Sequence, residues 1–165
     1  MRHTISILVD NQSGVLSRIA GLFSARGFNI ESLSVAETLE PDTSRITLVT
    51  SGNPDVIEQV TKRFNNMVNV IEVDDVTHKT RVERQMVLIR VQTNKNTRAE
   101  VLRIVDIFRA SVVDVGKNNY MLELTGDKEK IGAFIELLTP LGIKEIARTG
   151  TVALTRDIQK NNKEN

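Results

Sequence analysis

The sequence predicts an α+β protein built from two consecutive βαββαβ units. Short apolar runs that are typical of strands alternate with amphipathic stretches that are typical of helices, and the same order occurs twice. Turn-forming and helix-capping residues separate these stretches at corresponding places in the two halves. At 165 residues, the chain is long enough for two small domains, each with a core of its own.

The first half begins with an apolar run from Ile5 to Val9, which predicts a strand. A helix follows, with Val15, Leu16, Ile19, Leu22 and Phe23 on one face, and Gly27 ends it. The remaining predicted elements are a strand over 29–38 with a bulge near its start, a strand over 45–50, a helix capped by Asn53, and a strand over 68–76.

The second half repeats this order. It predicts a central strand over 84–93, a hairpin over 112–125 around Gly116, and a last strand region over 143–154 that Gly150 interrupts. Two helices separate these strands. Thr97 and Glu100 have the spacing of a capping box before the first helix, and Asp127 is the expected cap of the second.

Each unit is expected to place two helices on one face of a four-stranded antiparallel sheet, the ferredoxin-like arrangement. The expected boundaries are a first domain over 1–77, a linker over 78–83, a second domain over 84–156 and a polar tail over 157–165. Because such units leave sheet edges open, and open edges invite pairing with another chain, we expect a homodimer joined through the first domain.

The composition excludes several classes of protein. The net charge is +1, so nothing demands a nucleic acid or an anionic membrane surface as partner. The chain has no cysteine, which excludes disulfides and thiol catalysis and fits a cytoplasmic location. No apolar stretch approaches the roughly 20 residues that span a bilayer, and the first residues run directly into a strand, so we expect no signal peptide.

The sequence offers no set of catalytic or metal-binding residues. His3 and His78 are the only histidines, and neither has ligand-type neighbours at metal-binding spacing. Asp74 and Asp75 are adjacent in a predicted strand, so alternation places them on opposite faces. The serines lack a base and an orienting partner, and no glycine-rich phosphate-binding motif occurs. We therefore expect no active site, no metal and no cofactor in this chain.

The junction of the first strand and first helix has parts that suit a free amino acid. Gly14 would let a small ligand approach the backbone, and the first helical N–H groups would attract its carboxylate. Asn11 and Asn29 flank this helix and offer hydrogen-bond donors and acceptors. On these residues alone a plainer interpretation stays open, in which Ser13 caps the helix, Gly14 makes a turn and the asparagines serve turns.

A resemblance favours the first interpretation. The runs over 11–18 and 27–33 resemble the start of the small, regulatory subunit of acetolactate synthase (acetohydroxyacid synthase), a family with an N-terminal ACT domain. The similarity extends from Met1 to about Arg156 and includes the run over 81–84. It implies a regulatory subunit without an active site. Such a subunit activates the catalytic large subunit, a thiamine-diphosphate-dependent transferase, and confers feedback inhibition by valine in branched-chain amino acid biosynthesis.

The resemblance also implies where chemistry and effector lie. Thiamine diphosphate, Mg²⁺ and FAD are expected in the large subunit only, and the effector at a dimer interface of ACT domains. We expect Asn11 of one chain and Asn29 of the other to reach the polar groups of valine, and Gly14 to admit its carboxylate. Apolar contacts are expected from Val15, Leu16 and Ile30. The second half has Thr93–Asn96 at the corresponding junction, without glycine, so the site is assigned to the first half.

Two other functions remain open at this stage. ACT domains also occur in free-standing amino-acid sensors that act on another enzyme or on a transcription factor, although the full-length resemblance argues against this. RNA-recognition domains share the βαββαβ order, but they stack bases on aromatic residues of the sheet. Here most phenylalanines fall on predicted helices, so we expect no nucleic acid partner.

Overall fold

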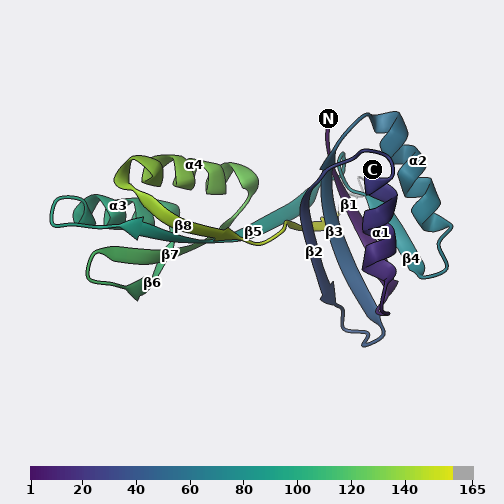
Figure 1. Ribbon diagram of the computed structural model, residues 1–165, viewed down its shortest axis with the longest axis horizontal. Coiled ribbons are helices and arrows are strands. Elements are labelled where there is room, and N and C mark those ends of the chain that lie inside the picture. The colour runs from purple at the N-terminus through teal and green to yellow at the C-terminus, as the bar shows by residue number, and fades with distance from the viewer. Residues whose placement is uncertain (158–165) are drawn as a thin grey trace, which may run out of the picture. The chain divides into compact units, whose positions relative to one another are not determined.

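The computed structural model describes residues 1–157 and divides into two compact units, which are taken separately here (Figure 1). Of the described residues, 1–82 and 151–157 form the first unit, and 83–150 form the second. Both units have the predicted ferredoxin-like topology, with antiparallel sheets and two helices each.

The first unit contains a sheet in the order β2-β3-β1-β4, in which every pairing is antiparallel. Its elements are β1 (Arg2–Asp10), α1 (Val15–Ser24), β2 (Ile30–Glu37), β3 (Thr43–Ser51), α2 (Pro54–Asn65) and β4 (Val70–Asp75). Both helices cover the same face of this sheet (Figure 1). The predicted bulge is confirmed, because the register of β2 against β3 shifts between Ile30 and Ser32.

Alternation along the strands decides which face the helices cover. Ile5 and Ile7 of β1 and Leu48 of β3 belong to one buried cluster with the apolar stripes of α1 and α2. Within this cluster the rings of Phe23 and Phe64 lie 5.3 Å apart between centroids, which locks the two helices together over the sheet. The side chains of even number on β1 therefore point to the other face, which is called the open face below.

The second unit repeats the topology with a sheet in the order β6-β7-β5-β8. Its elements are β5 (Arg81–Gln92), α3 (Arg98–Phe108), β6 (Ser111–Val115), β7 (Asn119–Gly126), α4 (Lys128–Leu138), a 3-10 turn η1 (Thr139–Leu141) and β8 (Ile143–Arg148). The central strand β5 buries Val87, Ile89 and Val91 against α3 and α4. The predicted hairpin around Gly116 is present between β6 and β7.

The ends of the predicted second domain differ from expectation. The strand β9 (Val152–Thr155) pairs with β5 of the second sheet but clusters with the first unit, although we expected the second domain to extend over 84–156. The N–H of Thr151 donates to the hydroxyl of Ser32 at 2.7 Å, and this long-range contact draws the segment back to the first sheet. The predicted polar tail over 157–165 lies, apart from Asp157, outside the described residues.

The predicted linker over 78–83 is also partly ordered structure. Arg81 and Val82 already belong to β5. The guanidinium of Arg81 donates to the carbonyls of Val76 at 2.8 Å and of Thr77 at 2.5 Å, so the segment is fastened to the end of the first unit. The first domain therefore extends past its expected end at residue 77.

Two of the three predicted helix caps are confirmed. The side chain of Asn53 accepts from the N–H of Asp55, and that of Asp127 accepts from the N–H of Lys130. The capping box at Thr97 is wrong, because the Thr97 hydroxyl accepts from the N–H of Asn94 instead of from a helical amide. The side chain of Asn94 competes locally for this turn, which sequence spacing does not reveal.

Candidate functional site

The junction between β1 and α1 is a turn that needs glycine. Gly14 is the N-cap residue of α1 and has φ 84°, a conformation that other residues adopt only with strain. No side chain caps the helix here, so the interpretation in which Ser13 caps it is wrong. A Cβ built on Gly14 meets nothing within 4 Å. The glycine thus satisfies the backbone and leaves open space at the helix N-terminus.

The first amides of α1 remain available to a ligand. The first complete helical hydrogen bond runs from the N–H of Arg18 to the carbonyl of Gly14, at 3.1 Å. The preceding bond, from Val15 N–H to Gln12 O, is long at 3.4 Å. The first turn of α1 carries no acidic residue that could neutralise the partial positive charge of these amides. This end of the helix can therefore accept a carboxylate.

The corresponding junction of the second unit is closed by its own side chain. The Asn94 carboxamide oxygen accepts from the N–H of Asn96 at 2.8 Å and from that of Thr97 at 3.1 Å. These amides immediately precede α3, so they are already satisfied within the chain. This contrast supports the placement of the site in the first unit only.

Asn11 is fixed at the same end of the first sheet as Gly14. Its backbone N–H donates to Asp42 O at 2.8 Å, and its side-chain amide donates to the Glu37 carboxylate at 2.9 Å. Since Glu37 is the last residue of β2, this hydrogen bond places Asn11 beside the end of that edge strand.

Asn29 and Ile30 lie at the opposite end of the same sheet. Asn29 is exposed, its carbonyl accepts from the Thr50 hydroxyl at 2.8 Å, and Ile30 pairs with Thr50. Asp10, next to Asn11, pairs with Thr43. A rise of about 3.3 Å per residue separates these two levels of the sheet by about 23 Å. One chain therefore does not bring Asn11 and Asn29 together.

The apolar candidates differ in their access to solvent. Leu16 is 36% exposed on α1, and Ile30 is half-buried. Val15 is only 2% exposed because its side chain packs into the core beneath α1. The apolar contact predicted for the Val15 side chain stays a prediction, and in this chain the helical stripe that made Val15 a candidate is the core-facing stripe.

The residue before Asn29, Phe28, is held in place by contacts with Phe23 and Gly52. Phe28 meets Phe23 edge to face, with ring centroids 6.3 Å apart and planes at 79°. A Cβ on Gly52 would lie 2.1 Å from the ring of Phe28, so the ring rests directly on this glycine. Sequence reasoning did not identify this contact, because only the pairing of β2 with β3 brings Phe28 to Gly52.

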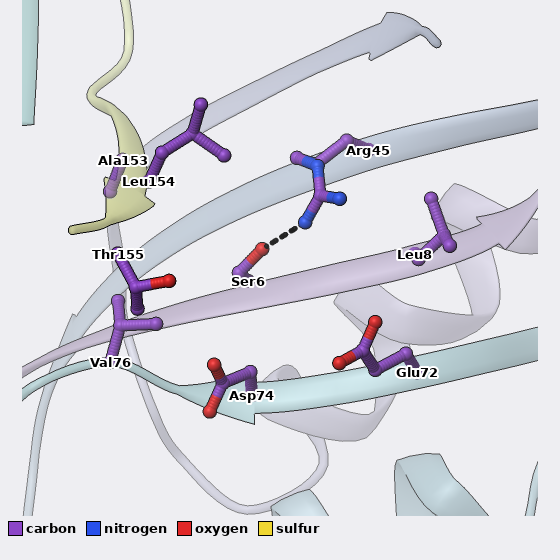
Figure 2. A pocket seen from close by; sticks show the side chains of 9 residues that line it. All are labelled: Ser6, Leu8, Arg45, Glu72, Asp74, Val76, Ala153, Leu154 and Thr155. Atoms are coloured by element: carbon purple, nitrogen blue, oxygen red, sulfur yellow. Dashed lines mark hydrogen bonds between the residues drawn. The ribbon is translucent and has the colours of Figure 1, made fainter. Parts of the chain in front are cut away.

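Sequence reasoning also missed a cavity of about 180 Å³ on the open face of the first sheet (Figure 2). Its walls come from β1, β3, β4 and β9, and it is lined by Ser6, Leu8, Arg45, Glu72, Asp74, Val76, Ala153, Leu154 and Thr155. The Arg45 guanidinium donates to the Ser6 hydroxyl at 2.9 Å, and Asp74 pairs with Lys79 at 2.5 Å. These charges are thus largely engaged within the chain. The cavity contains none of the residues predicted to bind the effector.

The two adjacent acids of β4 lie on opposite faces, as alternation predicted. Asp74 lines the cavity, whereas Asp75 accepts from the N–H of Thr77 and lies 3.5 Å from the buried ring of His3. The described residues contain no group of three or more His, Cys, Asp and Glu side chains that could hold a metal ion. No helix in the described part is long and apolar enough to cross a membrane.

The fold, together with an uncapped helix N-terminus after the first strand, defines an ACT-type module. Residues 5–72 match the family model described as the AHAS small subunit-like ACT domain, and residues 84–157 match the model described as the small subunit of acetolactate synthase. The chain belongs to the family of acetolactate synthase small subunits.

Individual relatives agree along nearly the whole chain. A probable acetolactate synthase small subunit of Archaeoglobus fulgidus is 48% identical over 160 residues, which cover 97% of this chain and 100% of the relative. The acetolactate synthase small subunit of Bacillus subtilis is 48% identical over 97% of this chain and 94% of its own. The crystal structure of the acetolactate synthase small subunit from Thermotoga maritima superposes with a TM-score of 0.87, at 39% identity, over 96% of this chain and 99% of that one.

We predict that Gly52→Ala lowers the free energy of unfolding by about 1–3 kcal/mol, because the new methyl group overlaps the Phe28 ring. Urea denaturation measures the change. The matched control is Gly21→Ala in the middle of α1, where a Cβ meets nothing within 4 Å; it should stabilise the protein by about 0.5–1 kcal/mol. Equal stability of the two variants would contradict the contact between Phe28 and Gly52.

Proposed function

We propose that this chain activates the catalytic large subunit of acetolactate synthase and makes that subunit sensitive to feedback inhibition by valine. Membership of the small-subunit family supports a regulatory role and partnership with the large subunit. The structural observation that carries the effector part is the uncapped N-terminus of α1 at Gly14, which lies next to Asn11 at the end of the first sheet.

We place the complete effector site between two copies of the chain. β2 lies at the edge of the first sheet, so its outer backbone groups can pair with the β2 of a second chain. Two-fold pairing of this edge is antiparallel, because the same strand meets itself in reverse. The start of β2 in one chain then lies beside its end in the other. Asn29 of one protomer thereby approaches Glu37 and Asn11 of its partner.

This pairing assembles groups of the chemistry that an amino acid needs. The carboxylate of valine would accept hydrogen bonds from the open amides around Gly14 to Leu16. The carboxamide oxygens of Asn11 and of the partner's Asn29 would accept from its ammonium group. Leu16 and Ile30, which are both partly exposed, would contact its isopropyl group.

Binding of valine at such a site would depend on how the two chains are arranged. A ligand that contacts both protomers stabilises the dimer arrangement in which both halves of the site meet. If that arrangement binds the large subunit in a less active form, valine inhibits. The same coupling requires the large subunit to change the affinity for valine by the same factor. In this proposal, the chemistry and its thiamine diphosphate, Mg²⁺ and FAD belong to the large subunit alone.

The first test is acetolactate formation by the purified large subunit alone, with this chain, and with this chain plus valine. The proposal predicts that the chain raises the rate and that valine reverses the increase. Stimulation that only leucine or isoleucine reverses would change the effector and keep the regulatory role. An unchanged rate in every mixture would contradict the proposal and favour a free-standing sensor with another partner.

We predict that Gly14→Asp abolishes valine binding, because a carboxylate at this position repels that of the ligand and fills the open space. Gly14→Ala is the matched control, since it shares the backbone strain of about 1 kcal/mol at φ 84° and adds neither charge nor a long side chain. Calorimetric titration should show binding to the alanine variant only. Normal binding by the aspartate variant would remove Gly14 from the site.

A mixing experiment tests whether each site uses two chains. Asn11→Ala and Asn29→Ala should each abolish high-affinity valine binding in homodimers. Mixed dimers of these two variants have one site with both substitutions and one site with none, so binding should return at half the stoichiometry. If the mixture binds no valine although mixed dimers form, as tagged co-purification would show, the cross-chain arrangement is wrong.

A further inference from the structure

The strand β9 lies against the open face of the first sheet. Ala153 and Thr155 line the cavity together with Ser6 of β1 (Figure 2). Just before β9, the N–H of Thr151 donates to the Ser32 hydroxyl on β2 at 2.7 Å. Just after it, the N–H of Arg156 donates to Thr80 O at 2.8 Å. The segment is therefore held at both of its ends within the first unit.

Burial on the open face indicates that β9 is an integral cover of this sheet. Val49 and Thr47 of β3 alternate with the helix-facing Leu48, so they point to the open face, yet they are 0% and 3% exposed. On the other side of the contact, Thr151 and Ala153 are 1% and 3% exposed. Val152, which alternates with them, is 51% exposed. One face of the segment is thus buried against the first sheet, and the other face is exposed.

Ser32 occupies a special place on the sheet that β9 covers. It lies directly after the β-bulge that separates it from Ile30, and it pairs with Val49. Asn29 and Ile30, at the start of the same strand, are the half of the effector site that each chain would offer to its partner. The Thr151–Ser32 hydrogen bond therefore ties the C-terminal segment to the strand that carries this half-site.

The covalent chain connects Thr151 directly to the second unit. β8 of the second unit ends at Arg148 and β9 begins at Val152, so only residues 149–151 separate the two strands. This connection is fastened to β5, because the N–H of Thr149 donates to Met86 O at 3.0 Å and the Thr149 hydroxyl accepts from the N–H of Met86 at 2.9 Å. A shift of β2 at its bulge would thus reach the end of β8 through the Ser32–Thr151 hydrogen bond and these connecting residues.

From this geometry we infer that the Ser32–Thr151 hydrogen bond couples effector occupancy at the β2 edge to the C-terminal strand and, through the chain, to the second unit. Ser32 acts as a positioning residue, which does not touch valine. The inference rests on the proposed function, since it concerns the response to the same effector. Removal of the Ser32 hydroxyl should weaken the coupling between valine and the large subunit more than it weakens binding of valine.

The test compares Ser32→Ala with Ser34→Ala. Ser34 is the next residue of β2 on the same open face, paired with Thr47, and serves as the matched control. The dissociation constant for valine is measured for the chain alone and for its complex with the large subunit, and the ratio of the two is the coupling. Ser32→Ala should reduce this ratio by about 2- to 30-fold and leave binding by the isolated chain near wild type. Ser34→Ala should behave as wild type.

A second measurement separates coupling from a merely structural effect. Amide hydrogen exchange over residues 148–156 should respond to valine in wild type and in Ser34→Ala, and lose this response in Ser32→Ala. If Ser32→Ala fails to fold, Ser32→Thr and Ser32→Val replace it as an equal-shape pair, of which only threonine should keep the coupling. The exchange and the coupling of each variant are compared with those of the wild-type chain.

Three results would overturn the inference. The first is an unchanged coupling ratio in a folded Ser32→Ala protein. The second is a loss of valine binding by the isolated Ser32→Ala chain that matches the loss of coupling, because Ser32 would then belong to the binding surface itself. The third is a wild-type chain that binds no valine, which would overturn the proposed effector as well. The wild-type control thus distinguishes failure of the proposed effector from failure of the Ser32 coupling alone.

Discussion

The position of β2 at the edge of the first sheet is the constraint on which the proposed effector site depends. A strand at a sheet edge presents backbone N–H and C=O groups that pair with another chain if nothing else covers them. In this protein Asn29 immediately precedes the edge strand β2, and the last residue of β2, Glu37, accepts a hydrogen bond from the side chain of Asn11. About 23 Å of sheet separates these two asparagines within one chain. Two-fold pairing of the edge is the simplest arrangement that joins them.

The two units show how one topology gives two different surfaces. Both have a strand that leads into a helix, and both helices begin with amides that lack acceptors inside the helix. In the second unit the carboxamide of Asn94 already binds the amides before α3, which closes that junction. In the first unit Gly14 takes a left-handed conformation and offers no side chain. A single difference in turn chemistry therefore separates a helix end without a side-chain cap from an end whose amides are already hydrogen-bonded within the chain.

Features that depend on local pattern were predictable from the sequence. The order of strands and helices follows from apolar periodicity, and Asn53 and Asp127 cap their helices as their residue types indicate. Local pattern also gave one wrong prediction. Thr97 and Glu100 have capping-box spacing, but the Thr97 hydroxyl accepts from the N–H of Asn94 and not from a helical amide. The sequence also did not separate Val15 from Leu16, since residues of one helical stripe share a face, and the pattern does not say which of them the core buries.

Features that depend on long-range contacts were not predictable. Thr151 meets Ser32, Phe28 rests on Gly52, and the cavity gathers side chains from four strands, and no spacing in the sequence signals any of these contacts. The packing of β9 with the first unit, although it pairs with β5, was not predictable for the same reason. The predicted binding residues stay predictions. The structure places Asn11 and Asn29 at opposite ends of the first sheet, so a single chain does not combine them.

The most direct measurement is a crystal structure of this chain with valine bound. The account predicts valine between two protomers, with its carboxylate at the α1 N-terminus near Gly14 and its ammonium group between Asn11 of one protomer and Asn29 of the other. Valine held by a single protomer, or valine in the cavity beside Arg45, would contradict the account.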